Sequence, residues 1–121
     1  MTMQDSISAA RTSGPVALAD GASAFEFNFP ATDVVFAGHF PQRPILPGIF
    51  QLEIARLAAG WVRNKNFSVN EIVKTKFQRP ILPGEILKLS LKLADENGVV
   101  SARANFTCGG QPAGEAFLKL S

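Results

Sequence analysis

The sequence is poor in the residues that bind metal ions or cross-link chains. Cys108 is the only cysteine and His39 the only histidine among 121 residues. A single cysteine excludes an intrachain disulfide and a cysteine-based zinc site, and a single histidine excludes a histidine-rich metal site within one chain. We therefore expect a protein that works without a metal ion.

Long hydrophobic runs and a strong charge imbalance are also absent from the sequence. No apolar run reaches the roughly 18 residues that a membrane span requires. Met1 to Gly14 lacks the apolar region of a signal peptide, so we expect a flexible tail over residues 1–14, a cytoplasmic protein and no membrane partner. A net charge of +2 and a pI of about 9.0 are too weakly basic to indicate a nucleic acid partner. They are compatible with an acidic protein partner.

The remaining residues, 15–121, have the size of one domain. Hydrophobic residues make up 46% of the sequence and include ten phenylalanines, enough to build a core. Three segments alternate between apolar and polar residues, the period of a half-buried strand. They cover residues 25–29, 87–93 and 100–108, and Asn97-Gly98 between the last two is typical of a hairpin turn. Further strands are expected over 72–77 and 116–120, with a short extended piece at 33–36.

One helix is expected after Pro47-Gly48. The run from Ile49 to Val62 is apolar on nearly all sides, which indicates a buried helix. A proline near the first turn fits, because its missing N–H would have no partner there. A curved antiparallel sheet around this helix would bury it, so the sequence predicts an α+β fold.

A seven-residue sequence, Gln-Arg-Pro-Ile-Leu-Pro-Gly, occurs twice, at residues 42–48 and 78–84. The first copy precedes the helix and the second precedes a strand. Two copies do not make a repeat protein. We interpret them as shared turn chemistry, with proline stiffening the chain and glycine permitting unusual backbone angles, and we assign no catalytic role to the second copy.

Three features around the helix start suggest acid/base chemistry. Glu53 lies within an apolar helical run, where burial would favour the protonated acid, and His39 is a possible base. The N–H of Gly48 would be an unpaired donor at the helix start, able to polarise a carbonyl. Together they fit proton abstraction beside a carbonyl with a leaving group two carbons away.

Each feature also has a structural interpretation. Glu53 can form a salt bridge with Arg56, three residues along the same helix face, which would favour the carboxylate. His39 can be a hydrogen-bonded structural residue, and Gly48 an ordinary helix-entry glycine. Cys108 falls on the apolar side of its strand and is expected to be a buried thiol.

The segment around His39 resembles the active-site segment of the 3-hydroxyacyl-ACP dehydratases of type II fatty acid synthesis, which have the hotdog fold. The matching parts are Gly38-His39-Phe40-Pro41, Pro44-Ile45-x-Pro47-Gly48 and Glu53. The second signature loop of that family resembles Lys76-Phe77-x-Arg79-Pro80-x-x-Pro83-Gly84. The similarity runs from about Asp33 to the C-terminus.

The resemblance implies an enzyme that dehydrates (3R)-hydroxyacyl thioesters on an acyl carrier protein to trans-2-enoyl thioesters. It implies a homodimer with active sites at the subunit interface, and no cofactor beyond the carrier's phosphopantetheine. His39 would take the C2 proton, Glu53 of the partner subunit would protonate the departing hydroxyl, and the Gly48 N–H would bind the thioester oxygen. Substrate-binding residues would be Phe40, Ile45, Pro47 and Arg79.

The sequence departs from the family pattern at several positions. Gln42 replaces the glycine of His-Phe-Pro-Gly, Arg56 replaces a small residue, and Leu57 stands where the family usually has a glutamine. An N-terminal His-Arg-Tyr-Pro-like motif is missing. The chain therefore resembles a shorter relative, of the kind associated with polyene or other specialised acyl chains as well as primary fatty acids.

Two other functions, and a side activity that isomerises the double bond, remain open on the sequence alone. A hotdog acyl thioesterase would use a carboxylate and water without a base at His39. A non-catalytic subunit that binds the acyl carrier would need neither His39 nor Glu53. Six basic residues are candidates for steering an acidic carrier or holding the phosphopantetheine phosphate, although each also fits a solvated surface: Arg43, Arg63, Lys65, Lys74, Lys76 and Arg79.

Overall fold

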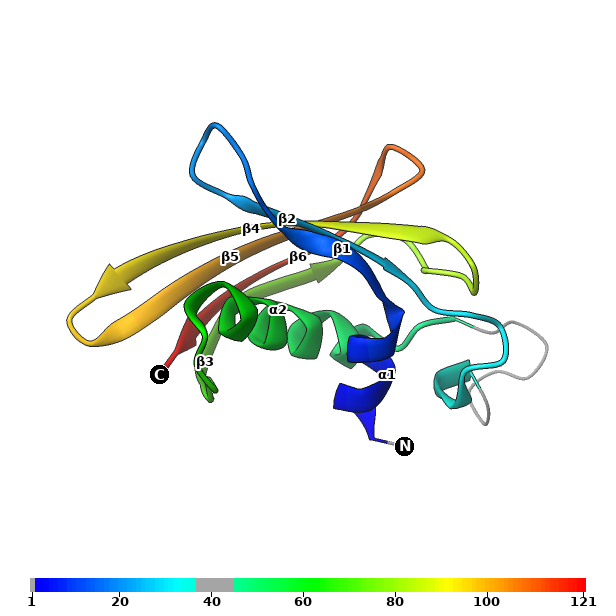
Figure 1. Cartoon of the computed structure of the whole chain (residues 1–121), viewed down its shortest axis with the longest axis horizontal. Helices are drawn as coiled ribbons and strands as arrows, with labels where there is room; N and C mark the ends of the chain where they lie inside the picture. Colours follow the sequence, from blue (N-terminus) through cyan, green and yellow to red (C-terminus); the bar gives the residue numbers. More distant parts are fainter. Residues whose placement is uncertain (1, 37–44) are drawn as a thin grey trace.

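The computed structural model of the protein describes residues 2–36 and 45–121. Within them, six antiparallel strands form one curved sheet in the order β1-β2-β4-β5-β6-β3. Helix α2 (Gly48–Arg63) lies against the concave face of this sheet, and the short helix α1 (Met3–Ala10) packs beside α2 (Figure 1). The predicted α+β architecture, a sheet wrapped around one long helix, is confirmed.

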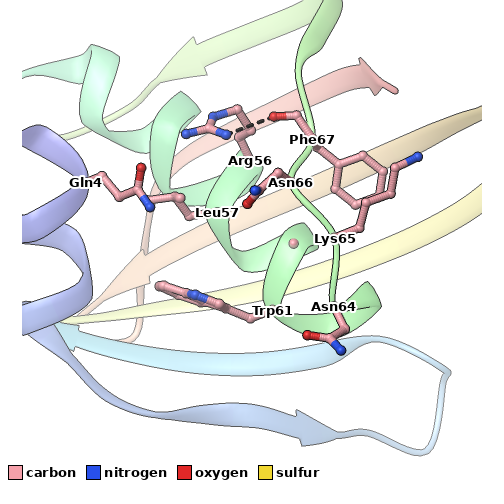
Figure 2. Close-up of a pocket in the computed structure, with 9 residues that line it drawn as sticks. Gln4, Arg56, Leu57, Trp61, Asn64, Lys65, Asn66 and Phe67 are labelled. Atoms are coloured by element: carbon pink, nitrogen blue, oxygen red, sulfur yellow. Dashed lines mark hydrogen bonds between the residues drawn. The ribbon is translucent and has the colours of Figure 1, made fainter.

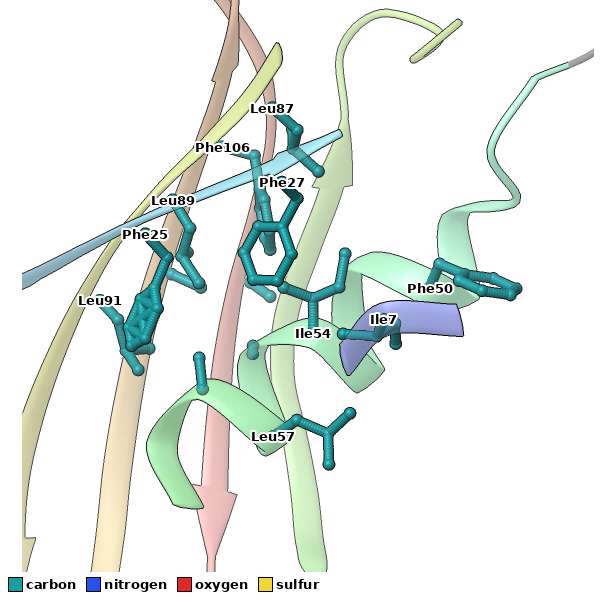
Figure 3. Close-up of a cluster of buried hydrophobic side chains, with 14 of the residues drawn as sticks. Ile7, Phe25, Phe27, Phe50, Ile54, Leu57, Leu87, Leu89, Leu91 and Phe106 are labelled. Carbon is teal, nitrogen blue, oxygen red and sulfur yellow. The ribbon is translucent and has the colours of Figure 1, made fainter. Parts of the chain in front are cut away.

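The alternating segments form the predicted strands. β2 spans Ser23–Asn28, β4 Ile86–Glu96, β5 Val99–Cys108 and β6 Gln111–Leu120. Their apolar side chains face α2, and Figure 3 shows Phe25 and Phe27 opposite Ile54 of the helix. Because strand side chains alternate between faces, the lysines of β4 point away from the core. Cys108 is buried as expected, and burial raises the pKa of its thiol.

Tight turns set the register of the three central strands. Asn97 and Gly98 have φ of 53° and 80°, and Gly109 and Gly110 have φ of 57° and 77°. Two consecutive residues with positive φ form the turn whose twist matches that of a hairpin. Lys92 therefore pairs with Arg103, and Ala104 pairs with Ala116. The same registers hold along most of the length of these strands.

Helix α2 begins and ends as its sequence predicts. Pro47 is the N-cap, and Asn64 ends the helix in the left-handed conformation with φ of 55°. The face against the sheet is fully covered, whereas Ile49 is 55% exposed and Leu52 and Glu53 are only partly covered. The single chain thus covers one side of a helix that is apolar on nearly all sides.

The two edges of the sheet differ in shape. β1 (Arg11–Ala17) pairs with β2 through two irregularities in register, whereas β3 (Val69–Phe77) is a nine-residue edge strand. Every residue of β3 is exposed, including four large apolar ones: Val69, Ile72, Val73 and Phe77. A long edge strand with apolar side chains offers backbone donors and acceptors to another chain.

Two expectations about the first third of the chain are wrong. The flexible tail expected over residues 1–14 contains α1 and the start of β1, and Ile7 is completely buried in the core. The helix is capped at Thr2, whose hydroxyl accepts a hydrogen bond from the Asp5 N–H at 3.0 Å. Val34–Phe36 is a 3-10 helix rather than an extended piece, because the Asp33 carboxylate accepts a hydrogen bond from the Val35 N–H at 2.9 Å. Among the described residues, no helix is long and apolar enough to cross a membrane.

Candidate active site

A cavity of about 300 Å³ lies at the N-terminal end of α2, where the two Ile-Leu-Pro-Gly segments meet. The Leu46 N–H donates a hydrogen bond to the Ile81 carbonyl oxygen at 2.8 Å, which joins the first segment to the second. The cavity walls come from the segment that enters α2, from the first turn of α2, and from the end of β3 with the loop that follows it. Segments far apart in the sequence therefore meet around one opening.

Gly48 stands at the centre of this wall. It is the first residue of α2, so its N–H has no partner within the helix, and the N-cap Pro47 makes no side-chain hydrogen bond to the helix. A Cβ on Gly48 would lie 2.7 Å from the ring of Phe77, a contact too close for a real side chain. Glycine is therefore required here for the ring of Phe77 to pack against the helix start. The positive end of the helix dipole faces the same space.

The structure brings together three of the predicted site residues. Ile45, Gly48 and Arg79 line this cavity, and Pro47 adjoins it as the helix cap. His39 and Phe40 lie outside the described residues. Their predicted roles therefore stay predictions.

Glu53 is part of a different face of α2. It lies five positions after Gly48, which is a rotation of about 140° around the helix, and it does not line the cavity. Its carboxylate accepts two hydrogen bonds from Arg56, one of them from Nε to Oε2 at 3.0 Å. The Glu53 and Arg56 side chains are 25% and 22% exposed, so the pair is partly buried. The predicted Glu53–Arg56 salt bridge is present.

Arg56 is held in place from two directions. Its Nη1 donates to the Phe67 carbonyl oxygen at 2.8 Å, and the hydrogen bonds to Glu53 raise the pKa of its guanidinium above the ordinary value. Figure 2 shows Arg56 reaching the chain segment that follows α2. This arrangement fixes the position of the Glu53 carboxylate, because a bidentate arginine restricts both of its oxygens.

Arg79 is also bound by a carboxylate. Its Nη2 donates to Glu85 Oε2 at 2.8 Å, and Glu85 Oε1 accepts from the Leu82 N–H at 2.8 Å. Glu85 thereby links the arginine to the turn of the second Ile-Leu-Pro-Gly segment. The hydrogen bond from Arg79 holds the pKa of the Glu85 carboxyl below its usual value.

Gln51 is a cavity residue that the sequence reasoning missed. It lies one helical turn after Gly48, is only 3% exposed and lines the same cavity. Its Oε1 is buried with no hydrogen-bond partner among the residues that the structure describes. A buried glutamine is unusual, and the signal available was a lone amide between Phe50 and Leu52 in an otherwise apolar run.

A second cavity, also of about 300 Å³, lies at the opposite end of α2 (Figure 2). Gln4 of α1, Trp61 of α2 and Lys65 of the following segment are among its lining residues. Nearby, the Arg11 guanidinium stacks on the Trp61 ring at 4.0 Å from its centroid. None of the predicted catalytic residues within the described ranges lines this cavity. It faces the C-terminal end of the helix dipole, which disfavours an anionic ligand.

A curved antiparallel sheet wrapped around one central helix, with a cavity at the N-terminus of that helix, is the hotdog fold. Comparison with known proteins agrees with this class. The family profile called ApeI-like, described as ApeI dehydratase, matches residues 17–114. Because this match covers most of the sequence, the chain belongs to the ApeI-like dehydratase family.

Individual relatives are consistent with this assignment. The chain is 34% identical to a 3-hydroxyacyl-[acyl-carrier-protein] dehydratase FabZ of Clostridium botulinum, covering 84% of this chain and 76% of the relative. The structure of the dehydratase heterocomplex ApeI:P from Xenorhabdus doucetiae contains a chain that is 26% identical, with a TM-score of 0.70. That similarity covers 89% of this chain and 98% of the other. An uncharacterised protein from Erwinia carotovora is 27% identical, with a TM-score of 0.68 over 83% of this chain and 82% of its own.

Proposed function

We propose that this protein dehydrates (3R)-hydroxyacyl thioesters carried on an acyl carrier protein, giving trans-2-enoyl thioesters in the assembly of fatty acid or polyene-type chains. The observation that carries the proposal is the cavity lined by Gly48, the first residue of α2, in a chain of the ApeI-like dehydratase family. The relative from C. botulinum is named for the same reaction.

The chemistry requires one base and one acid. His39 takes the proton from C2, the electron pair of that bond forms the C2–C3 double bond, and the C3–O bond breaks. The proton of Glu53 goes to the departing oxygen, so the leaving group is water. A positioned base or acid typically contributes about 10²–10⁴-fold to the rate.

Gly48 stabilises the negative charge that develops on the thioester oxygen. Backbone N–H groups at a helix N-terminus act on such an oxygen together with the helix dipole. Pro47 caps the helix without a side-chain hydrogen bond, and Phe77 forms an apolar wall beside Gly48. The Gly48 N–H is therefore available to a substrate oxygen beside an apolar side chain. Phe40, Ile45, Pro47 and Arg79 bind the substrate around it.

A second copy of the chain is part of the proposal. Glu53 points to a different helix face from that of Gly48 and does not line the cavity, so the acid for one site comes from the partner chain. The exposed apolar residues of β3 and the uncovered Ile49 supply a surface for such a partner. The Xenorhabdus relative is a heterocomplex, which makes a different partner chain the competing outcome.

Besides the side chains and the backbone N–H described above, the proposed reaction uses one group, the phosphopantetheine arm of the carrier. The phosphopantetheine arm of the acyl carrier protein delivers the thioester, and no metal ion or organic cofactor takes part. Arg79 lines the cavity and is suited to attract the negatively charged phosphate of that arm through its positive charge, while its Nη2 stays on Glu85.

Mass spectrometry of the carrier tests the proposed reaction. A 3-hydroxyacyl carrier protein is incubated with the purified protein, and the mass of the loaded carrier is followed with time. Loss of one water from the acyl group is the expected result. Loss of the whole acyl group would identify a thioesterase, and an unchanged carrier that still binds the protein would identify a non-catalytic subunit.

A further inference from the structure

The buried amide of Gln51 is the polar group in the cavity whose role the proposed reaction leaves open. Its Oε1 has no hydrogen-bond partner among the described residues, although only 3% of Gln51 is exposed. A buried acceptor without a partner is unfavourable, so such groups are uncommon in folded proteins. Phe50 and Ile54 of the same helix are packed into the core (Figure 3).

Gly114 of β6 makes room for this amide. A Cβ at Gly114 would lie 2.1 Å from Gln51 Oε1 and 3.1 Å from the Lys76 carbonyl oxygen. Gly114 has no positive φ, so backbone conformation does not require glycine there. The space above it is therefore occupied by the Gln51 amide, with the Lys76 carbonyl on the same side.

The amide can exchange its two ends in place. The last torsion of a glutamine side chain has a broad, roughly two-fold profile, so a half-turn costs little. Gln51 Oε1 and the Lys76 carbonyl oxygen both lie close to the position of a Gly114 Cβ, and both are acceptors. A half-turn would place the donor Nε2 on this side and turn Oε1 away from it. A ligand that brings a hydrogen-bond donor to Oε1 would stabilise this orientation.

The polar groups of the cavity then match one part of the substrate. Gly48 offers a donor and Gln51 an acceptor, from helix positions three residues or about 4.5 Å apart along the axis. A thioester oxygen only accepts hydrogen bonds and suits Gly48. Near the reacting carbons of a 3-hydroxyacyl thioester, the 3-hydroxyl is the group that donates.

We propose that Gln51 is a positioning and specificity-determining residue that accepts a hydrogen bond from the 3-hydroxyl of the acyl thioester. This inference rests on the proposed function. The hydroxyl keeps its hydrogen, which points to Gln51 Oε1, while the hydroxyl oxygen receives the proton of Glu53. The water that leaves therefore carries both hydrogens. Gln51 itself exchanges no proton.

The test compares two ligands that differ only in the hydroxyl. A 3-hydroxyacyl pantetheine thioester and the saturated acyl thioester of the same length are titrated into His39→Ala protein, and mass spectrometry checks that neither ligand has reacted. We expect the hydroxylated ligand to bind about tenfold more tightly, the effect of one hydrogen bond in a buried site. In His39→Ala/Gln51→Met protein the two affinities become equal, while that of the saturated ligand stays within about threefold.

Two further variants separate this role from a structural one. Gln111→Met, the same change at an exposed position of β6, should keep the tenfold preference. Gly114→Ala, which forces the amide to move, should reduce it. Gln51→Met should not lower the melting temperature, because it removes an unpaired buried acceptor.

A preference that survives Gln51→Met would overturn the inference. Equal weakening of both ligands would also overturn it, because the amide would then only shape the cavity. The dehydration assay on wild-type protein is independent of these titrations. A protein that prefers the hydroxylated ligand and yet fails to dehydrate it would contradict the proposed function and leave the role of Gln51 intact.

Discussion

The four residues Ile-Leu-Pro-Gly take two different structures in this molecule. At 45–48 the isoleucine lines the cavity, the leucine is buried and the glycine begins a sixteen-residue helix. At 81–84 the isoleucine is buried, the leucine is 44% exposed and the glycine adopts φ of 79° in a turn that leads into β4. The two copies touch through the hydrogen bond from Leu46 to Ile81.

The residues that follow each copy decide its structure. Ile49 to Val62 provide the apolar helical run that starts at Gly48. Glu85 follows Gly84 and folds back, with its carboxylate on the Leu82 N–H and on Arg79. The same prolines and glycine thus open a helix in one place and close a turn in the other. The first copy supplies groups to the proposed chemistry, and the second supplies the opposite wall.

The largest expected effect concerns the copy that begins helix α2, where the proposed acid/base chemistry takes place. His39→Ala and Glu53→Gln should each lower turnover by about 10²–10⁴-fold, because no other histidine can replace the base and glutamine cannot donate the proton. Mixing the two inactive proteins should restore activity if base and acid come from different chains. With free exchange about half of the molecules are heterodimers with one intact site, so the ceiling is about a quarter of wild-type activity per chain.

Native mass spectrometry provides the control for this experiment by counting heterodimers. If heterodimers form and activity stays at zero, base and acid belong to one chain. Arg56→Ala removes the partner that binds Glu53 within the chain and keeps the acid. The Arg56→Ala protein should therefore retain substantial activity. If Arg56→Ala abolishes activity and Glu53→Gln does not, the Glu53–Arg56 pair has a structural role instead.

The strands and the start of helix α2 could be predicted from the sequence, whereas the burial of Ile7 and Gln51 could be seen only in the structure. The alternation at 25–29 and 87–93 predicts strands because one face of the sheet is buried, and Pro47-Gly48 before an apolar run predicts the helix start. The burial of Ile7 depends on α2 lying nearby, so local composition suggested a tail. Gln51 was missed for a similar reason: its environment comes from Gly114, which is 63 residues away in the chain.

The second prediction compares the two glycines, beginning with Gly48. Gly48→Ala places a Cβ 2.7 Å from the Phe77 ring, which must move together with the helix start. We expect kcat/KM to fall by about 10²-fold, because a small displacement of a catalytic donor is costly. Steady-state kinetics measures the loss, and Gly48→Ala/Phe77→Leu should recover part of it. Unchanged activity in Gly48→Ala would remove Gly48 from the site.

The third prediction is the matching change in the second copy. Gly84→Ala meets no atom within 4 Å, but alanine is disfavoured at φ of 79°. The expected cost is about 1–2 kcal/mol of unfolding free energy with kcat/KM within twofold of wild type. Urea unfolding and the dehydration assay measure the two quantities. Loss of activity without loss of stability would give the second copy a catalytic role.

The smallest expected effect is a dependence of stability on pH in the second copy. The hydrogen bond from Arg79 holds the pKa of Glu85 below its usual value of 4.5, so the folded state binds fewer protons at this carboxyl than the unfolded state does. The stabilisation is therefore complete at neutral pH and is lost as the pH falls through 4.5 towards the folded pKa. The effect is modest, because a partly exposed pair is screened by water. Thermal melts of wild type and Glu85→Gln at pH 7, 5, 4 and 3 measure this effect. The other carboxyls with lowered pKa, among them Asp95 and Glu115, titrate in both proteins, so their contribution cancels in the difference.

The difference in melting temperature between the two proteins should be largest at pH 7 and shrink towards pH 3. A difference that stays constant would mean that the Arg79–Glu85 pair does not stabilise the turn through charge.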